Sequence, residues 1–484
     1  MSAPATFFWH DYETTGADPR RDRPLQFAGV RTDADLNIIE PPRVLYCQPP
    51  TDLLPAPGAC AVTGIAPQHA RAEGLAEAEF AAAVHDELAR PGTCGVGYNS
   101  LRFDDEVTRH LLWRNFYDPY AREWRDGASR WDVIDLLRAA RALRPDGLSW
   151  PDHEPGVPSF RLEDLAAANG IDHDAHDALA DVHATLALVR LLRRAQPRLY
   201  DYVLAARDRR RTAALLALDA TEPVLHVSGR YPARRGCIAP VAALARHPVD
   251  RSGIIVADLM ADPAPLLEHD ADTLAAALFT PAAERAAEAP SVPLKVVKTN
   301  RFPVLAPLST LTPEAEVRLG IDPATARAHL ARLRAAPGLA ARLERVFAPA
   351  DQPAPDPDEA LYAGLLGDAD RDRLAAVRRQ PPAALADFDP GFADPRLAPL
   401  YFRYRARNWP QTLTPAEQDA WRSLRWRRLC RGEAGSPRSL GAFRDELAAL
   451  RAAGTLAPAL ADQLAAWEQA LFADLPPCEP ADAP

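Results

Sequence analysis

Lysine is almost absent from this sequence of 484 residues, in which Lys295 and Lys298 are the only lysines and arginine carries nearly all of the positive charge. The formal net charge of −10 argues against indiscriminate nucleic-acid binding but leaves room for a local basic groove. No apolar run approaches the length of a membrane span, and no basic segment followed by an apolar run opens the chain. We therefore expect a cytoplasmic protein that does not associate with membranes.

The sequence also lacks any C-x-x-C pair or cysteine cluster with the spacing of a zinc site. Its six cysteines are scattered along the chain. We expect all of them to be reduced thiols, as is usual in a cytosol; they are Cys47, Cys60, Cys94, Cys237, Cys430 and Cys478.

The length predicts about three domains, and the hydrophobic share of 48% and charged share of 25% are typical of globular proteins. Short β-like runs predict strands in the first 195 residues and again at 224–228, 253–258 and 294–298. Residues 350–358 have the composition of a linker, and a helical pattern follows from 359 to 472. We expect disorder after Asp474. The predicted domains are 1–195, 196–350 and 351–484.

The most informative stretch spans residues 7–16, an aromatic strand-like run that contains Asp11 and Glu13. Side chains alternate in a strand, so these two carboxylates share a face. Crowded carboxylates repel each other unless a cation lies between them, and oxygen ligands suit Mg²⁺ or Mn²⁺. For a D-x-E pair taken alone, we favour a solvated strand face over a metal site, because exposed acidic residues are common.

Two further polar clusters follow. Asp104 and Asp105 open a predicted helix, where capping of free N–H groups is the alternative explanation. His176 and Asp181 lie where the next helical pattern begins, and both side chains overhang one pocket if His176 lies in the helix entry. A single His or Asp there would more often be a capping or surface group. The three clusters together favour a metal site.

This order of motifs resembles the DEDD exonucleases that carry a histidine, and more closely the bacterial exodeoxyribonuclease I family. The resemblance covers nearly the whole chain. This sequence departs from the family pattern at two places. The loop before His176 is shorter, and the acidic Glu222 lies in a region where basic residues would suit an acidic partner. The segments that carry the resemblance are 10–14, 102–109, 114–121, 158–163, 176–178, 225–229 and 404–408.

The resemblance implies an α/β RNase H-like exonuclease domain, an SH3-like β-rich domain that closes one side of the DNA channel, and an all-α C-terminal domain. It implies 3′-to-5′ hydrolysis of single-stranded DNA to nucleoside 5′-monophosphates, in DNA repair and recombination. The implied partner is the acidic C-terminal tail of single-stranded DNA-binding protein. We expect a monomer.

Phosphodiester hydrolysis needs an activated water and stabilisation of the leaving oxygen, which two divalent ions about 4 Å apart supply. We assign Asp11 as the bridging ligand, Glu13 and Asp181 as ligands of the water-activating ion, and Asp104 as support for the second ion, with Asp105 as its substitute. His176 would accept the proton of the attacking water. The expected cofactor is Mg²⁺, two ions, which Mn²⁺ can replace.

Aromatic side chains among arginines suit single strands, because bases stack on rings while arginines follow phosphates. By resemblance, Glu13 also contacts substrate. For Tyr120 and Trp124, the alternative is packing in the core. Single arginines are more often solvated surface groups. For the basic run 421–428, we favour a solvated helix face over binding of DNA or a partner. The residues placed along the DNA path are Arg109, Tyr120, Trp124, Arg138, Arg144, Phe160 and Arg161, with Arg161 nearest the terminal nucleotides.

Two other functions are consistent with parts of this pattern. One is a related 3′-to-5′ nuclease that acts on RNA or short oligonucleotides, for which a compact chain without the two additional domains would be typical. The other is a catalytically silent DNA-binding module, which the loss of an acidic ligand would indicate. All four acidic ligands are present.

Overall fold

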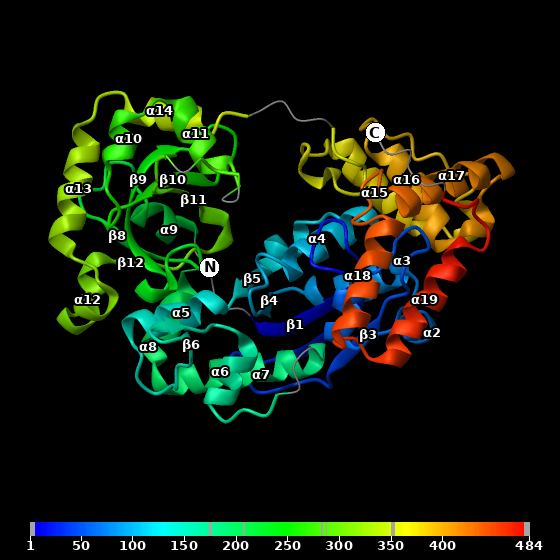
Figure 1. Ribbon diagram of the computed structural model, residues 1–484, viewed down its shortest axis with the longest axis horizontal. Coiled ribbons are helices and arrows are strands. Elements are labelled where there is room, and N and C mark those ends of the chain that lie inside the picture. Colours follow the sequence, from blue (N-terminus) through cyan, green and yellow to red (C-terminus); the bar gives the residue numbers. More distant parts are fainter. Residues whose placement is uncertain are drawn as a thin grey trace. The chain divides into compact units, whose positions relative to one another are not determined.

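The fold is described from a computed structural model (Figure 1). Its contacts divide the chain into two compact units, which we describe separately. The site unit comprises residues 2–130, 173–186 and 353–484, and the second unit comprises residues 131–172 and 187–352. The structure describes residues 5–173, 177–206, 209–281, 284–286, 288–349 and 354–478.

A mixed five-stranded sheet of order β3-β2-β1-β4-β5 is built around β1. Strands β2 and β3 continue the sheet in antiparallel pairs on one side of β1, while β4 is parallel to β1 on the other. Four of the short β-like runs of the first 195 residues, at 7–13, 26–31, 43–47 and 94–99, are confirmed as β1 to β4. The strands are β1 (Thr6–Thr14), β2 (Pro24–Thr32), β3 (Arg43–Tyr46), β4 (Thr93–Gly97) and β5 (Ser129–Asp132).

Helices follow these strands in the site unit. The helix predicted to open at Asp104 is α4, and the one predicted from the His176 segment is α7, whose first turns belong to this unit. The bounds are α1 (Pro57–Thr63), α2 (Pro67–Glu73), α3 (Glu77–Leu88), α4 (Asp104–Arg114), α7 (Ala178–Ala195), α15 (Asp368–Arg379), α16 (Leu397–Asn408), α17 (Pro415–Arg431), α18 (Leu440–Ala453) and α19 (Pro458–Phe472).

The core of the site unit lies between the sheet and helices α3 and α4, where Phe8, Phe27, Phe80 and Leu111 are buried together. The C-terminal helices bury their apolar faces against the same part of the chain. One cluster joins Leu54 and residues of α1 to α18 and α19, and another joins the end of α4 to α15 and α16. The α-helical C-terminal segment is therefore packed onto the elements that surround β1.

The second unit contains a five-stranded sheet of order β11-β10-β9-β8-β12, covered in part by α11, α13 and α14. The predicted strands at 224–228, 253–258 and 294–298 are confirmed as β8, β10 and β11. Its elements are α5 (Ile134–Leu143), β6 (Asp152–Glu154), β7 (Val157–Pro158), α6 (Leu162–Ala168), α8 (Pro197–Ala205), α9 (Arg209–Leu215), β8 (Val224–Val227), β9 (Ile238–Arg246), β10 (Gly253–Asp258), α10 (Ala264–Glu268), α11 (Ala271–Phe279), β11 (Leu294–Lys298), β12 (Leu305–Pro307), α12 (Pro313–Leu319), α13 (Pro323–Ala335) and α14 (Leu339–Val346).

In neither unit does a described helix combine the length and the apolar character needed to cross a membrane.

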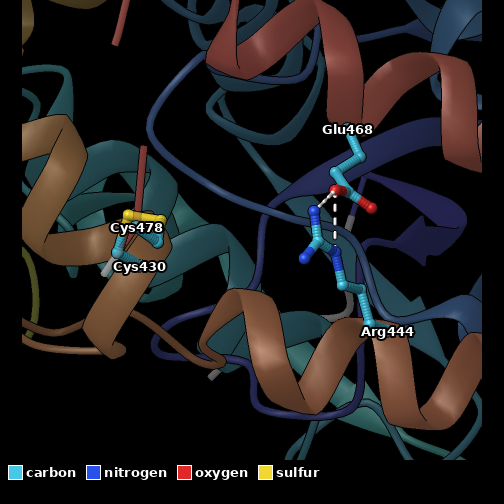
Figure 2. Close-up of a disulfide and its surroundings, with 4 residues drawn as sticks. All are labelled: Cys430, Arg444, Glu468 and Cys478. Carbon is cyan, nitrogen blue, oxygen red and sulfur yellow. Dashed lines mark hydrogen bonds and ion pairs between the residues drawn. A yellow bond between two sulfur atoms is a disulfide. The ribbon is translucent and has the colours of Figure 1, made fainter. Parts of the chain in front are cut away.

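The expectation of six reduced thiols is wrong for Cys430 and Cys478, which form a disulfide between α17 and the segment after α19 (Figure 2). The 48-residue separation of these cysteines gives no sequence signal of their proximity. Cys47, Cys60, Cys94 and Cys237 are buried thiols, as expected. The disulfide also shows that the chain end predicted to be disordered after Asp474 is held as far as Cys478.

The basic run 421–428 is only in part the solvated helix face that we favoured, because Arg422 and Arg427 are exposed but the other two arginines are not. Arg425 and Arg428 are buried, and Arg425 donates to Asp474 Oδ2 at 2.7 Å. Residues 354–358, at the end of the segment expected to be a linker, are fixed to the fold, because Asp356 and Asp358 form ion pairs with arginines of α16. Buried charge pairs in both segments account for acidic and basic residues that composition alone assigns to solvent.

Candidate active site

Strand β1 and helix α7 bring three of the predicted carboxylates together. Asp11 and Glu13 share a face of β1 because side chains alternate along a strand, and Asp181 lies in the first turn of α7. One carboxylate oxygen from each residue lies within 4.8 Å of those of the other two. Three hard oxygen donors at this spacing fit a divalent cation such as Mg²⁺ or Mn²⁺.

The electrostatics of this cluster agree with that donor set. Burial raises the pKa of Asp11 well above its usual value, and the charges of Asp104, Asp181 and Glu13 raise it further. Burial also raises the pKa of Glu13 to about 8, with Asp181 and Asp104 contributing. The carboxylates thus oppose one another's ionisation, and a cation among them would relieve that repulsion.

Asp104 completes the acidic group from the start of α4. It is buried, and its Oδ1 accepts a hydrogen bond from the backbone N–H of Tyr12 at 3.2 Å, between the two acidic residues of β1. The N-cap residue of α4, Phe103, makes no side-chain cap. Asp104 is therefore directed to the strand that carries Asp11 and Glu13.

Asp105, proposed as a substitute for Asp104, lies in a different environment. Its carboxylate accepts from Arg122 Nη2 at 2.5 Å and lies 3.5 Å from Arg130 Nη1. Although burial raises the pKa of Asp105, the charges of Arg122 and Arg130 bring it well below the usual value. Its ion pairs are structural, which leaves Asp104 as the better candidate for the second ion.

The proposed general base, His176, lies outside the described residues. The structure shows instead that His173 Nε2 is hydrogen-bonded to Asp181 Oδ1. Sequence reasoning missed His173, although it lies in the same segment, because the motif pairs a single histidine with Asp181. His173 is a neighbour that orients one carboxylate of the cluster.

Three residues of the predicted DNA path belong to the site unit. Arg109 is buried and donates to both carboxylate oxygens of Glu123, at 2.7 and 2.8 Å, and to Tyr362 Oη at 2.9 Å. Tyr120 and Trp124 line a cavity of about 280 Å³, and Trp124 is 59% exposed. Tyr120 also packs partly on the core, whereas the Trp124 ring has the Arg125 guanidinium 5.5 Å from its centroid.

The other four belong to the second unit. The Arg138 guanidinium lies 5.6 Å from the centroid of the Phe160 ring and pairs with Asp135 at 2.8 Å. Arg144 donates to the carbonyl oxygen of Leu143 at 2.5 Å. The side chain of Arg161 is exposed.

A mixed sheet with a cluster of carboxylates is the arrangement expected of a metal-dependent exonuclease. A family model described as "Exonuclease" matches residues 8–189, the Exonuclease I SH3-like domain matches 207–349, and the Exonuclease I C-terminal domain matches 355–471. Exodeoxyribonuclease I of Escherichia coli K12 is 47% identical over 446 residues, 92% of each chain. The chain belongs to the exodeoxyribonuclease I family.

Solved structures of this family are similar along nearly the whole chain. Exonuclease I from Methylocaldum szegediense has a TM-score of 0.92 and 48% identity, covering 97% of this chain and 100% of its own. E. coli Exonuclease I in complex with a dA16 oligonucleotide has a TM-score of 0.91 and 44% identity, covering 96% and 100%. A zinc-bound E. coli ExoI-ssDNA complex has a TM-score of 0.91 and 44% identity, covering 97% and 100%.

A structure described as SSB/Exonuclease I in complex with inhibitor CFAM has a TM-score of 0.86 and 44% identity, covering 97% of this chain and 98% of its own. Together the matches confirm the predicted fold class: an RNase H-like exonuclease domain, an SH3-like domain and a helical C-terminal domain, in that order. An exonuclease domain of this kind implies dependence on a divalent metal.

Proposed function

We propose that this protein is a Mg²⁺-dependent exonuclease that degrades single-stranded DNA from its 3′ end and releases nucleoside 5′-monophosphates. The observation that carries the proposal is the cluster of Asp11, Glu13 and Asp181 in a chain of this family. Solved relatives hold single-stranded oligonucleotides, which supports the substrate class. Degradation of such strands would serve DNA repair and recombination.

The residues of the cluster would act on a bound 3′-terminal phosphodiester. Asp11 would bridge two Mg²⁺ ions, with Glu13 and Asp181 on one ion and Asp104 beside the other. When bound, the ions would supply activation of water and stabilisation of charge on the leaving oxygen. His176 would accept the proton of the attacking water, a role that suits an imidazole near neutral pH. Mn²⁺ would substitute for Mg²⁺ because it accepts the same hard oxygen donors.

Substrate would be held by stacking and by phosphate contacts. The exposure of Trp124, beside a cavity that Tyr120 also lines, supports a role in stacking bases. We keep Arg138, Arg144, Phe160 and Arg161 as proposed contacts to the strand. Arg109 is the weaker candidate for a phosphate contact, because Glu123 and Glu106 already neutralise its guanidinium.

The remaining proposals concern organisation and partners. We propose domains at 1–195, 196–350 and 351–484, a monomer, and a cytoplasmic location. The solved SSB/Exonuclease I structure supports the acidic tail of single-stranded DNA-binding protein as a partner. In this chain, Glu222 pairs with Arg327 at 2.9 Å, so one acidic side chain in the SH3-like region is matched internally.

The test is a time course with purified protein, Mg²⁺ and single-stranded DNA labelled at its 5′ end. Parallel reactions use the same strand with a blocked 3′ end, its duplex, and an RNA strand of matched sequence. We expect progressive shortening of the free DNA strand alone, release of mononucleotides, and loss of activity in EDTA.

Other outcomes would refute the proposal in distinct ways. Equal or faster cleavage of the RNA strand would indicate the RNA-directed nuclease, because discrimination depends on how the site treats the 2′-hydroxyl. Binding without cleavage would indicate the silent DNA-binding module. Shortening of the 3′-blocked strand would contradict the proposed polarity.

A further inference from the structure

The chain turns back on itself directly after Glu13. In this turn the backbone N–H of Thr15 donates to the carbonyl oxygen of Arg23 at 2.8 Å, and Thr15 Oγ1 donates to Asp22 Oδ1 at 3.0 Å. The backbone N–H of Arg23 donates in turn to Thr15 Oγ1 at 2.9 Å. The buried Thr15 thus closes the turn two residues beyond a proposed metal ligand.

A side chain from the C-terminal domain holds this turn from outside. Arg438 lies between α17 and α18, and its Nη2 donates to Asp22 Oδ1 at 3.1 Å. Its Nη1 donates to the carbonyl oxygens of Leu54 and Thr15, the latter at 3.5 Å. One guanidinium therefore ties the end of β1, the β1–β2 turn and the segment before α1 together.

Gly16 makes room for this contact. A Cβ atom at Gly16 would lie 2.5 Å from Arg438 Nη2 and 2.5 Å from Asp22 Oδ2, closer than any normal contact. The absence of a side chain is thus what lets the guanidinium reach the turn. Hydrogen bonds of this kind, from a charged donor to buried acceptors, are among the stronger ones in proteins.

We propose that Arg438 is a positioning residue for the metal site, which makes the C-terminal domain part of the catalytic apparatus. The inference rests on the proposed function and deepens it. Asp11 and Glu13 repel each other on one strand face once both are ionised, as metal binding requires, so a loose strand end would let Glu13 turn away from Asp11. Arg438 restrains that end through Thr15, without itself being a ligand.

The test measures Mn²⁺ binding by electron paramagnetic resonance in the absence of nucleic acid. In Arg438→Gln we expect about tenfold weaker Mn²⁺ binding, the lower end of the range for residues that orient metal ligands. Arg438→Lys keeps a cation that can reach one acceptor and should be intermediate. Gly16→Ala should weaken binding as Arg438→Gln does, because the added Cβ displaces the guanidinium and the Asp22 carboxylate from each other.

The matched control is Arg444→Gln in the same domain. Arg444 is 61% exposed and donates to Glu468 Oε1 on α19 at 2.9 Å (Figure 2). Arg444→Gln removes the same chemical group, a guanidinium, from α18, and we expect this variant to bind Mn²⁺ with wild-type affinity. Weak binding in this control equal to that of Arg438→Gln would overturn the specific role of Arg438.

Wild-type Mn²⁺ affinity in Arg438→Gln, together with a lowered melting temperature, would show a purely structural role and overturn the inference. If Arg438→Gln did not fold, unchanged affinity in both Arg438→Lys and Gly16→Ala would overturn it equally. A wild-type protein that bound Mn²⁺ but cleaved nothing would refute the proposed function alone, and the loss in Arg438→Gln would still support this inference.

Discussion

The most severe stability change that we expect outside the metal site is at Asp358. This side chain is 2% exposed, and its oxygens lie 2.9 Å from Arg23 Nη2, 2.6 Å from Arg407 Nη2 and 3.1 Å from Arg403 Nη1. Burial raises the pKa of Asp358, but the charges of Arg407, Arg403 and Arg23 outweigh it and hold the pKa well below its usual value. This carboxylate thus lies at the centre of a buried network, in which Asp52 also pairs with Arg407 and Asp356 also pairs with Arg403.

Asp358→Asn keeps the size of the side chain and removes this charge. Neutralising one partner of a buried ion pair costs about 3–5 kcal/mol, because buried positive charge then loses a counter-charge, and here Asp52 and Asp356 are left to pair with arginines that Asp358 also held. For a unit of this size, each kcal/mol lost from the free energy of unfolding lowers the melting temperature by about 2–4 °C, so we expect the melting temperature to fall by about 6 to 20 °C. Calorimetry and tryptophan fluorescence would measure the shift.

Asp368→Asn is the matched control, because Asp368 is 96% exposed and pairs with Arg371 on the same helix at 2.6 Å. An exposed pair of this kind contributes about 0–1 kcal/mol, so the melting temperature should change by only a few degrees. Equal shifts in the two variants would refute the reasoning, since burial would then contribute nothing to the cost.

Asp181→Asn should reduce cleavage to background without lowering the melting temperature of the metal-free protein, because it removes one of several repelling carboxylates; a large loss of stability would contradict this. Cys430→Ser opens a disulfide of 48-residue separation and should lower the free energy of unfolding by up to about 4 kcal/mol. A reducing agent should destabilise the wild type by the same amount and should not change the stability of the variant. Trp124→Ala should raise KM for single-stranded DNA about tenfold, with kcat little changed, since one stacked base contributes about 1–3 kcal/mol; an unchanged KM would remove Trp124 from the DNA path. Asp52 and Asp358 bind protons less readily in the folded than in the unfolded protein, so the melting temperature should fall as pH drops below about 4, and less steeply in Asp358→Asn; parallel pH profiles would contradict this.

Local patterns predicted the parts of the molecule that depend on neighbours in sequence. The alternation of β1 placed Asp11 and Glu13 on one face, and the helical periodicity after His176 placed Asp181 at the start of α7. Strand β9 was not predicted, because its alanine-rich sequence with a proline does not have strand propensity. That Asp181 meets the carboxylates of β1 followed from family resemblance, since no local rule relates residues so distant in sequence.

Long-range ion pairs account for most of what was missed. Arg428 and Arg109 were read as surface or DNA-binding groups, yet Asp52 and Glu123 pair with them in the interior. Arginine has the same sequence appearance in both settings, and the difference lies in a carboxylate that only the fold brings near. Cys430 and Cys478 were misjudged for the same reason.

The claim that Asp11, Glu13 and Asp181 hold the catalytic metal is tested most directly by diffraction at the manganese absorption edge. Crystals would contain Mn²⁺ and a single-stranded oligonucleotide with a cleavage-resistant 3′ linkage. The account predicts an anomalous peak in contact with carboxylate oxygens of all three residues, and no such peak in Asp181→Asn. A cleavage-competent protein whose Mn²⁺ bound elsewhere, with no peak at this cluster, would contradict it.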